Sequence, residues 1–209
     1  MWMKIHLFII YKMSFRIEKK FRLTKFEKLS IKKGLINKGM RELYPKRVIN
    51  SCYFDSHDLR CFYDSDEGVL PRKKIRLRWY ENKEKITKEI KVSSIEGRFK
   101  SSENFYDYKF LEKFNYSIYD KVYGILYPKI IVSYYREYFL LKNIRITFDT
   151  DIKYKNLNGL NRFFLKDQEN VMEVKADIKN SLSKLEGFID LPSSRFSKYC
   201  RGIALCKNY

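Results

Sequence analysis

The segment around Lys73–Tyr80 alternates charged and apolar residues with a period of two. A β-strand places every second side chain on the same face, so this pattern predicts a strand with one basic and one apolar face. The basic face would carry Arg72, Lys74, Arg76 and Arg78, and the apolar face Ile75, Leu77 and Trp79.

Four further segments show the same division. Their charged faces would carry Arg16, Glu18 and Lys20; Glu89 and Lys91; Arg145, Thr147 and Asp149; and Glu173, Lys175 and Asp177. One such strand is ordinary, because antiparallel sheets often have one solvated face. Five of them favour a charged interior, in which facing cations need a polyanion and the few carboxylates need a cation or a partner.

The net charge agrees with an anionic ligand. Among 209 residues, 44 are Lys or Arg and 25 are Asp or Glu, which gives a formal charge of +19. This excess favours nucleic acid, an anionic membrane surface or phosphates as the partner. A merely basic surface and a biased genomic composition are the alternatives.

The chain is long enough for one domain with a proper core, which we assign to residues 14–209. Residues 1–13 are interpreted as an N-terminal extension of unknown role, with Met13 as an alternative start. No run approaches the roughly 20 apolar residues that span a bilayer. The four cysteines lack zinc-ligand spacing, so a reduced, cytoplasmic protein with buried thiols is predicted.

Periodicity and turn signals predict strands at 14–23, 48–54, 73–80, 86–93, 130–141, 143–151 and 171–177. Helices are predicted at 24–37, with Thr24 as N-cap, at 103–126 and at 195–206. Residues 64–68 are predicted to form a turn and 97–102 a loop. Strands joined largely by hairpins indicate an α+β, mainly antiparallel fold, either an open sheet or a closed barrel.

Several motifs occur in a fixed order along the chain. They are Ser-Cys-Tyr-Phe-Asp-Ser (51–56), Arg-Lys-Lys-Ile-Arg-Leu-Arg-Trp-Tyr (72–80), Glu-Ile-Lys (89–91), Tyr-Tyr-Arg (134–136), Arg-Ile-Thr-Phe-Asp (145–149), Met-Glu-Val-Lys (172–175) and Arg-Phe-Ser-Lys-Tyr (195–199). This ordered set, from about Ser14 to the C-terminus, resembles the VTC domain, the polyphosphate polymerase branch of the CYTH-like triphosphate tunnel enzymes. The resemblance implies a closed eight-stranded barrel with flanking helices and a basic tunnel.

The resemblance also implies roles for individual residues. Lys20, Arg76, Arg78, Lys91, Arg136 and Arg145 would bind a triphosphate or the growing chain, and Arg72 and Lys100 match the family pattern less closely. Lys198, with Arg195, would reach the tunnel from the last helix, and strand alternation adds Lys74 and Lys175. Glu173 would hold Mn²⁺ or Mg²⁺, and Glu18 and Glu89 would either bind a second metal or support the metal ligands. Arg76, Arg78, Glu173 and Lys198 are the predicted catalytic residues.

The first strand departs from the wider superfamily. Its pattern Glu-x-Glu-x-Lys is replaced here by Arg16-x-Glu18-x-Lys20, so a cation stands in place of one metal-binding carboxylate. This favours the polymerase branch over the phosphohydrolase and cyclase branches. It also leaves a two-metal site without one of its expected ligands.

The implied activity is transfer of the γ-phosphoryl group of ATP to the end of an inorganic polyphosphate chain. Hydrolysis of tripolyphosphate or of nucleoside triphosphates and polyphosphate binding without turnover are the alternatives. A specific nucleic-acid partner is disfavoured, because Phe21, Trp79 and Phe148 are predicted to lie opposite the cations rather than beside them.

Overall fold

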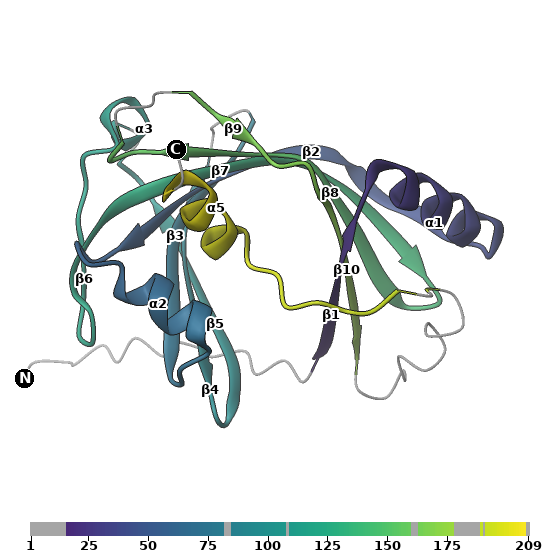
Figure 1. Ribbon diagram of the computed structural model, residues 1–209, viewed down its shortest axis with the longest axis horizontal. Coiled ribbons are helices and arrows are strands. Elements are labelled where there is room, and N and C mark those ends of the chain that lie inside the picture. Colours follow the sequence, from purple (N-terminus) through teal and green to yellow (C-terminus); the bar gives the residue numbers. More distant parts are fainter. Residues whose placement is uncertain are drawn as a thin grey trace, which may run out of the picture.

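The protein is described from a computed structural model, which covers residues 16–81, 85–107, 109–159, 163–177, 189 and 191–207. The predicted N-terminal extension, residues 1–13, lies outside these residues. Figure 1 shows a strongly curved sheet with helices along its edges and ends.

Within the described residues, ten strands form one antiparallel sheet. They are β1 (Arg16–Leu23), β2 (Arg41–Asp55), β3 (Arg72–Tyr80), β4 (Ile86–Ser94), β5 (Gly97–Phe105), β6 (Ile118–Asp120), β7 (Gly124–Leu141), β8 (Ile144–Asn156), β9 (Leu165–Lys166) and β10 (Asn170–Asp177). The main path runs β1-β10-β8-β7-β2-β3-β4-β5, while β6 pairs with β7 and β9 with β8. The predicted mainly antiparallel α+β class is confirmed.

The sheet forms an arch rather than a closed barrel. β2, β7 and β8 span the top in Figure 1, with β3, β4 and β5 descending on one side and β1 and β10 on the other. β1 and β5 are the two ends of the path, and no pairing between them is found in the part of the chain that the structure describes. The predicted closure of the barrel is therefore not confirmed by strand pairing.

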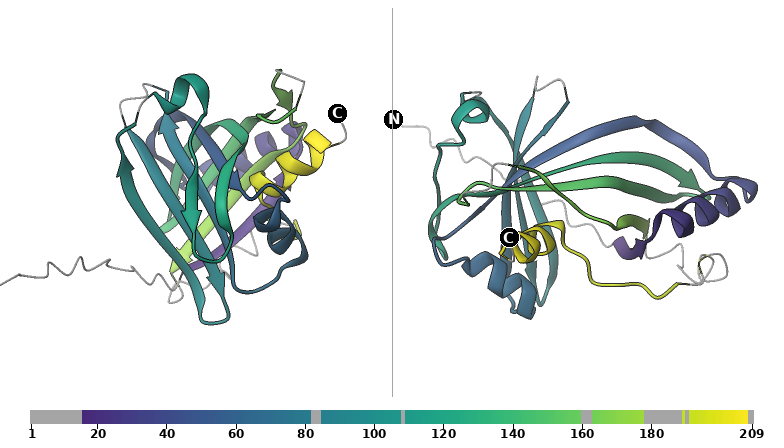
Figure 2. Two further views of the ribbon diagram at one scale, coloured as in Figure 1. Left: turned by 90° about the vertical axis from the view of Figure 1, so that its left-hand side faces the viewer. Right: turned by 45° about the horizontal axis from the view of Figure 1, so that its top comes forward.

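A C-terminal segment, residues 191–197, crosses the open side of the arch (Figures 1 and 2). It is tied to β1 by the Ser194 amide, which donates to the Lys20 carbonyl at 2.8 Å, and by Lys20 Nζ, which donates to the Phe196 carbonyl at 2.9 Å. On the other side Lys74 Nζ of β3 donates to Ser197 Oγ at 3.0 Å. This segment, rather than a strand pair, links the two arms of the arch.

The helices are α1 (Lys25–Asn37), α2 (Arg60–Glu67), α3 (Phe110–Lys113) and α5 (Lys198–Lys207). Thr24 caps α1 as predicted: its hydroxyl accepts from the Glu27 amide, and the Glu27 carboxylate accepts from the Thr24 amide. Leu35 is the fully buried residue by which α1 packs on the core beside β1 and β10.

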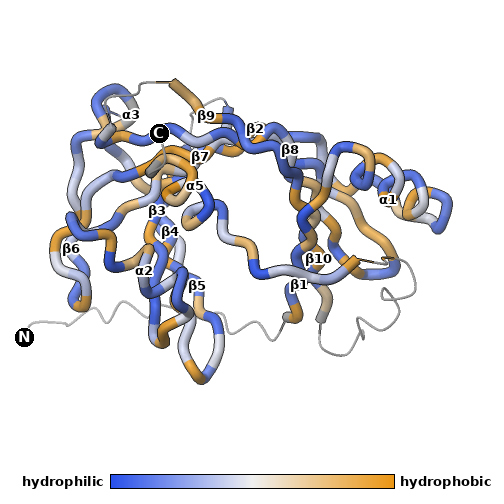
Figure 3. Tube along the Cα trace, viewed as in Figure 1, coloured by the Kyte–Doolittle hydropathy of each residue, from blue (hydrophilic) through white to orange (hydrophobic). Residues whose placement is uncertain are grey.

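Alternation along the strands separates two environments, as the changing hydropathy along both arms in Figure 3 shows. Ile75, Leu77 and Trp79 are buried in an apolar cluster on the outer side of β3. Phe21 and Phe148 are buried in a second cluster with Met172, Val174 and Ala176 of β10. The charged positions of the same strands consequently face the inside of the arch.

Three predicted elements are wrong. Residues 97–102 form most of β5, because Gly97, at φ +140°, makes only the turn and the chain then pairs with β4. Residues 103–126 do not form one helix: Phe105, Phe110 and Tyr116 pack edge to edge, and Gly124 turns the chain into β7 at φ +74°. Residues 64–67 continue α2, which ends at Gly68 in the left-handed conformation.

All four cysteines are free, and Cys52, Cys61 and Cys200 are buried, as predicted. None of the helices in the described ranges is long and apolar enough to cross a membrane. The cytoplasmic location stays a prediction.

Candidate functional site: a cation-lined cavity

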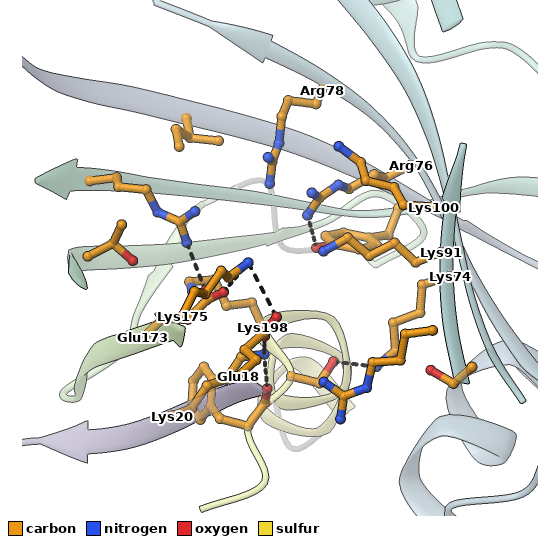
Figure 4. Close-up of a pocket in the computed structure, with 18 of the residues that line it drawn as sticks. Glu18, Lys20, Lys74, Arg76, Arg78, Lys91, Lys100, Glu173, Lys175 and Lys198 are labelled. Atoms are coloured by element: carbon orange, nitrogen blue, oxygen red, sulfur yellow. Dashed lines mark hydrogen bonds and ion pairs between the residues drawn. The ribbon is translucent and has the colours of Figure 1, made fainter. Parts of the chain in front are cut away.

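The inside of the arch encloses a cavity of about 900 Å³. Its cationic lining residues are Lys20, Arg72, Lys74, Arg76, Arg78, Lys91, Arg98, Lys100, Arg136, Arg145, Lys175, Arg195 and Lys198. Glu18 and Glu173 are the carboxylates among the lining residues. Every residue predicted to bind substrate therefore lies in one cavity, which Figure 4 shows from within.

Two sides of this cavity differ in their charge. We call the lining residues of β3, β4 and β5 the cationic wall; its charged members are Arg72, Lys74, Arg76, Arg78, Lys91, Arg98 and Lys100. We call the lining residues of β1, β8 and β10 the mixed wall; they are Glu18, Lys20, Arg145, Thr147, Glu173 and Lys175. β2 and β7, at the top of the arch in Figure 1, connect the two walls.

Strand register brings three lysines of the cationic wall into one row. Lys74 of β3 lies opposite Lys91 of β4, which in turn lies opposite Lys100 of β5. Like charges directly opposite each other destabilise a sheet. Glu89 pairs with Lys100, but Lys74 and Lys91 have no carboxylate partner among the described residues. The row therefore favours an anion that lies along it.

Lys91 is the central member of this row. It has no hydrogen bond or ion pair to any described residue, and its side chain stays exposed toward the cavity. Loss of bulk solvent inside the enclosed cavity, and then repulsion from Arg76 and Arg78, lower its pKa well below the usual value of lysine. An anionic ligand would relieve this repulsion.

Glu89 lies on the same face of β4 as Lys91 and directly opposite Arg76, but it is buried and is not among the residues that line the cavity. Its Oε2 accepts from Nε of Arg76 at 2.7 Å, and its Oε1 accepts from Nζ of Lys100 at 2.7 Å. Burial alone would raise the pKa of Glu89, but Arg76, Arg78 and Lys100 lower it far below its usual range. Glu89 thus orients Arg76, whose Nη1 also donates to the Tyr53 hydroxyl at 2.8 Å.

Glu173 is the buried carboxylate of the mixed wall, with 7% of its surface exposed. Its Oε1 lies 2.6 Å from Lys175 Nζ, and its Oε2 lies 3.5 Å from Arg136 Nη2. Burial would raise the pKa of Glu173, but Lys175, Arg136 and Lys20 together lower it well below the usual range. The group is therefore a carboxylate at neutral pH.

Arg136 and Lys198 share one buried carboxylate, that of Asp149. Arg136 donates to both Asp149 oxygens, at 2.5 and 2.6 Å, and Lys198 also contacts Asp149. Both cations lie over the Tyr134 ring, with Lys198 Nζ 4.6 Å and the Arg136 guanidinium 5.3 Å from its centroid. Asp149 and Tyr134 thereby hold Arg136 and Lys198 in position at the cavity.

The position of Lys198 depends on how α5 is anchored. Tyr199, the next residue, stacks on Tyr53 at 5.0 Å between ring centroids, and its hydroxyl donates to Asp55. Asp55 also accepts from the amides of Cys61 and Phe62 at the start of α2. One buried carboxylate at the end of β2 thus holds both helices.

Some members of the site were not predicted. Arg98 was missed because residues 97–102 were interpreted as a loop. Asp149 was assigned to a charged strand face, but its role as the partner of Arg136 and Lys198 was not predicted. Tyr53, Tyr134 and Tyr138 line the cavity beside the cations. The sequence pattern had assigned Phe21, Trp79 and Phe148 to the opposite face but had assigned these tyrosines to none. They lie on β2 and β7, where apolar residues follow one another and hide the alternation.

Glu18 and Glu173 are the carboxylates of the mixed wall that could bind a metal. No group of three or more His, Cys, Asp or Glu residues that could hold a metal occurs in the described ranges. Glu18 and Glu173, however, both contact the ammonium group of Lys175, so their oxygens converge on one cation. Two carboxylates suit Mg²⁺ or Mn²⁺ when substrate phosphates supply further oxygens, so the donor set fits a metal shared with the substrate.

Fold and site together define a class: an arched antiparallel sheet with a cation-lined interior. Among solved structures, a candidate adenylate cyclase from Bacillus halodurans shares this fold with a TM-score of 0.58 and 11% identity, over 88% of this chain and 94% of that one. A conserved hypothetical protein from Pyrococcus furiosus gives a TM-score of 0.56 and 13% identity, over 88% and 99%. A Hippeastrum protein reported to have a dominant triphosphatase activity gives 0.50 and 15%, over 90% and 95%.

The family model of the VTC domain matches two overlapping stretches, residues 4–121 and 100–207. The chain therefore belongs to the VTC domain family, as its motifs predicted, and its fold is that of the CYTH-like triphosphate tunnel proteins. A comparison with curated protein sequences finds no match.

Proposed function

We propose that this protein is a polyphosphate polymerase, which transfers the γ-phosphoryl group of ATP to the end of a polyphosphate chain held in the cavity. The observation that carries the proposal is the row of Lys74, Lys91 and Lys100, three cations that face one another across three strands. Lys100 pairs with Glu89, but Lys74 and Lys91 have no carboxylate partner among the described residues. A linear polyanion fits such a row better than a single small anion does. Membership of the VTC domain family supports the same substrate class.

In this proposal different cations of the cavity bind the chain and stabilise the phosphoryl group that is transferred. Lys74, Lys91 and Lys100 would hold the chain, and Arg76 and Arg78 would bind the oxygens that gain charge during transfer. Arginine suits the second task because its planar fork binds phosphate oxygens in pairs. The remaining predicted contacts would come from Lys20, Arg72, Arg136, Arg145, Lys175, Arg195 and Lys198.

A divalent metal, Mn²⁺ or Mg²⁺, would be held by Glu173 and Glu18 together with substrate phosphates. When bound, it would neutralise charge on the phosphates and align them. Glu89 is left out of this set, because it does not line the cavity and its oxygens accept from Arg76 and Lys100. The protein's own residues supply the rest of the charge neutralisation.

The chemistry asks little more of the protein. Phosphoryl transfer depends mainly on alignment and on neutralisation of spreading charge. The attacking group would be a terminal phosphate, which is already ionised, so no general base is required. This agrees with the absence of His among the described residues that line the cavity.

Incubation of the full chain with ATP and Mn²⁺ tests the proposal. Chains long enough to form a ladder on a polyacrylamide gel, together with ADP, support polymerisation. Release of free phosphate alone would instead support the triphosphatase alternative, an activity reported for the Hippeastrum protein of the same fold. Binding of polyphosphate without any turnover would leave a non-catalytic binding protein.

A further inference from the structure

Lys175 lies where two carboxylates of the mixed wall converge. Its Nζ is 2.6 Å from Glu173 Oε1 and 3.3 Å from Glu18 Oε2. The register of β1 and β10 produces this arrangement, because Glu18 lies opposite Lys175 and Lys20 opposite Glu173. Figure 4 shows the three side chains of Glu18, Glu173 and Lys175 meeting inside the cavity.

The other oxygens of the two carboxylates are also directed at cations. Glu173 Oε2 faces Arg136 at 3.5 Å, and Glu18 Oε1 faces Lys20 at 3.3 Å. A divalent metal would have to compete with these cations, above all with the ammonium group that both carboxylates share. Without a ligand, therefore, this site is already neutralised by the protein itself.

A third oxygen at the same place lacks a partner. The Thr147 hydroxyl lies on β8 directly opposite Glu173, is buried, and has no hydrogen-bond partner among the described residues. Buried hydroxyl groups are normally satisfied, so an unsatisfied one beside two carboxylates indicates that a ligand completes the site. A metal-bound water or a phosphate oxygen would do so.

Lysine is suited to a temporary role here. Its charge is carried on a flexible four-carbon stem, and 24% of the Lys175 side chain is exposed to the cavity. A phosphate that enters the cavity offers the ammonium group a new acceptor. Once the ammonium moves to it, the two oxygens that faced Lys175, Glu18 Oε2 and Glu173 Oε1, become available to a metal together with that phosphate.

Building on the proposed function, we infer that Lys175 is an internal counter-cation that keeps Glu18 and Glu173 from binding a divalent metal until a polyphosphate enters. Metal binding then follows the polyanion and depends on it. The protein grips its substrate without metal, and metal joins only when phosphates are in place to share it.

Electron paramagnetic resonance of Mn²⁺ with the full chain, in the absence of ATP and polyphosphate, tests this inference. The wild type should bind Mn²⁺ weakly, and Lys175→Met should bind one ion about tenfold or more tightly, because a competing charge is gone. Glu173→Gln in the same Lys175→Met protein should abolish the gain. Lys175→Arg, which keeps the charge, should behave like the wild type.

Lys74→Met is the matched control, since it removes one positive charge from the same cavity but no contact with Glu18 or Glu173. It should raise Mn²⁺ affinity by about twofold at most. An equal gain in Lys74→Met and Lys175→Met, or tight Mn²⁺ binding by the wild type, would overturn the inference. Circular dichroism establishes that each variant is folded.

A second measurement needs only the wild type and Glu173→Gln. Adding tripolyphosphate should produce a protein-bound Mn²⁺ signal in the wild type that Glu173→Gln lacks. Tripolyphosphate that binds without bringing Mn²⁺ onto the wild type overturns the inference alone. Tripolyphosphate that does not bind at all overturns the proposed function, whereas the comparison of ligand-free variants still reports on Lys175 itself.

Discussion

The two walls of the cavity are built from strands of the same alternating pattern but carry different charge. On the cationic wall, Lys74, Lys91 and Lys100 face one another across three strands. On the mixed wall, each carboxylate faces a cation, with Glu18 opposite Lys175 and Lys20 opposite Glu173. Lys74 and Lys91 of the first wall have no carboxylate partner among the described residues, whereas both carboxylates of the second wall pair with its own lysines. We infer that the cationic wall grips the chain and the mixed wall serves the reaction.

The largest expected effect separates turnover from binding on the mixed wall. Glu173→Gln should lower metal-dependent product formation from ATP by about 100-fold or more, because loss of metal stabilisation costs several kcal/mol. Tripolyphosphate binding in EDTA, measured by calorimetry, should be kept, since the substitution removes a negative charge from the cavity. Glu103→Gln, whose side chain is 65% exposed on β5, is the control and should keep full activity. Full activity of Glu173→Gln would remove this residue from the mechanism.

On the cationic wall the opposite result is expected. Lys91→Met should weaken tripolyphosphate binding by about tenfold or more, given about 1.5–3 kcal/mol for a hydrogen bond to a charged group. Chemical denaturation should show the variant to be at least as stable as the wild type, because Lys91 faces Lys74 and Lys100 without a partner.

Lys88→Met is the matched control for that variant, since Lys88 lies on the other face of β4 and pairs with Glu103 at 2.8 Å. Its tripolyphosphate affinity should stay within about twofold of the wild type. Similar losses for Lys88→Met and Lys91→Met would mean that only net charge matters and that the row has no particular role.

A third prediction concerns α5, which brings Lys198 to the cavity. A Cβ at Gly202 would lie 2.5 Å from Tyr154 Cδ1 and 2.7 Å from Ile130 Cδ1. Gly202→Ala should therefore destabilise the protein by about 1–3 kcal/mol through overpacking. Gly34→Ala in α1 meets no atom within 4 Å and should instead stabilise it by up to about 1 kcal/mol. Thermal unfolding of the pair checks both signs, and a neutral Gly202→Ala would contradict the close packing of α5.

The smallest expected effect is an uptake of protons when the polyanion binds. Burial lowers the pKa of Lys91 and of Lys74 below the usual 10.5, and Arg76 and Arg78 lower that of Lys91 further. A bound polyanion favours the charged forms, so binding should take up protons at mildly alkaline pH, and affinity should fall as the pH rises.

In the free protein the same lowered pKa values make the free energy of unfolding rise with pH toward 10.5, because the unfolded chain binds more protons. Calorimetry in buffers of different ionisation enthalpy measures the uptake, which Lys91→Met should reduce; proton release on binding would contradict this assignment.

Strand alternation in the sequence was enough to predict which side chains face the cavity. A period of two assigns Lys74, Arg76, Lys91 and Glu173 to charged faces without knowledge of the fold, because the opposite faces are consistently apolar. The same reasoning missed Tyr53 and Tyr134, whose strands are apolar on both sides and show no alternation.

What the sequence could not predict is register and closure. Lys91 lies opposite Lys100 only because residues 97–105 form β5. The polar residues after Gly97 led us to interpret this segment as a loop. The contact of Lys175 with Glu18 depends on pairing between β1 and β10, which lie near opposite ends of the chain. In the described residues β1 and β5 do not pair, and residues 191–197 cross the open side of the arch. Hydrophobic periodicity carries no such information.

The central claim, that the cationic wall grips a phosphate chain, is tested most directly by a crystal structure with tripolyphosphate. Phosphate oxygens should lie within hydrogen-bonding distance of Lys74, Lys91 and Lys100, with the chain running along that row. Phosphates bound on the outer surface only, or a cavity left without phosphate at saturating tripolyphosphate, would contradict the account.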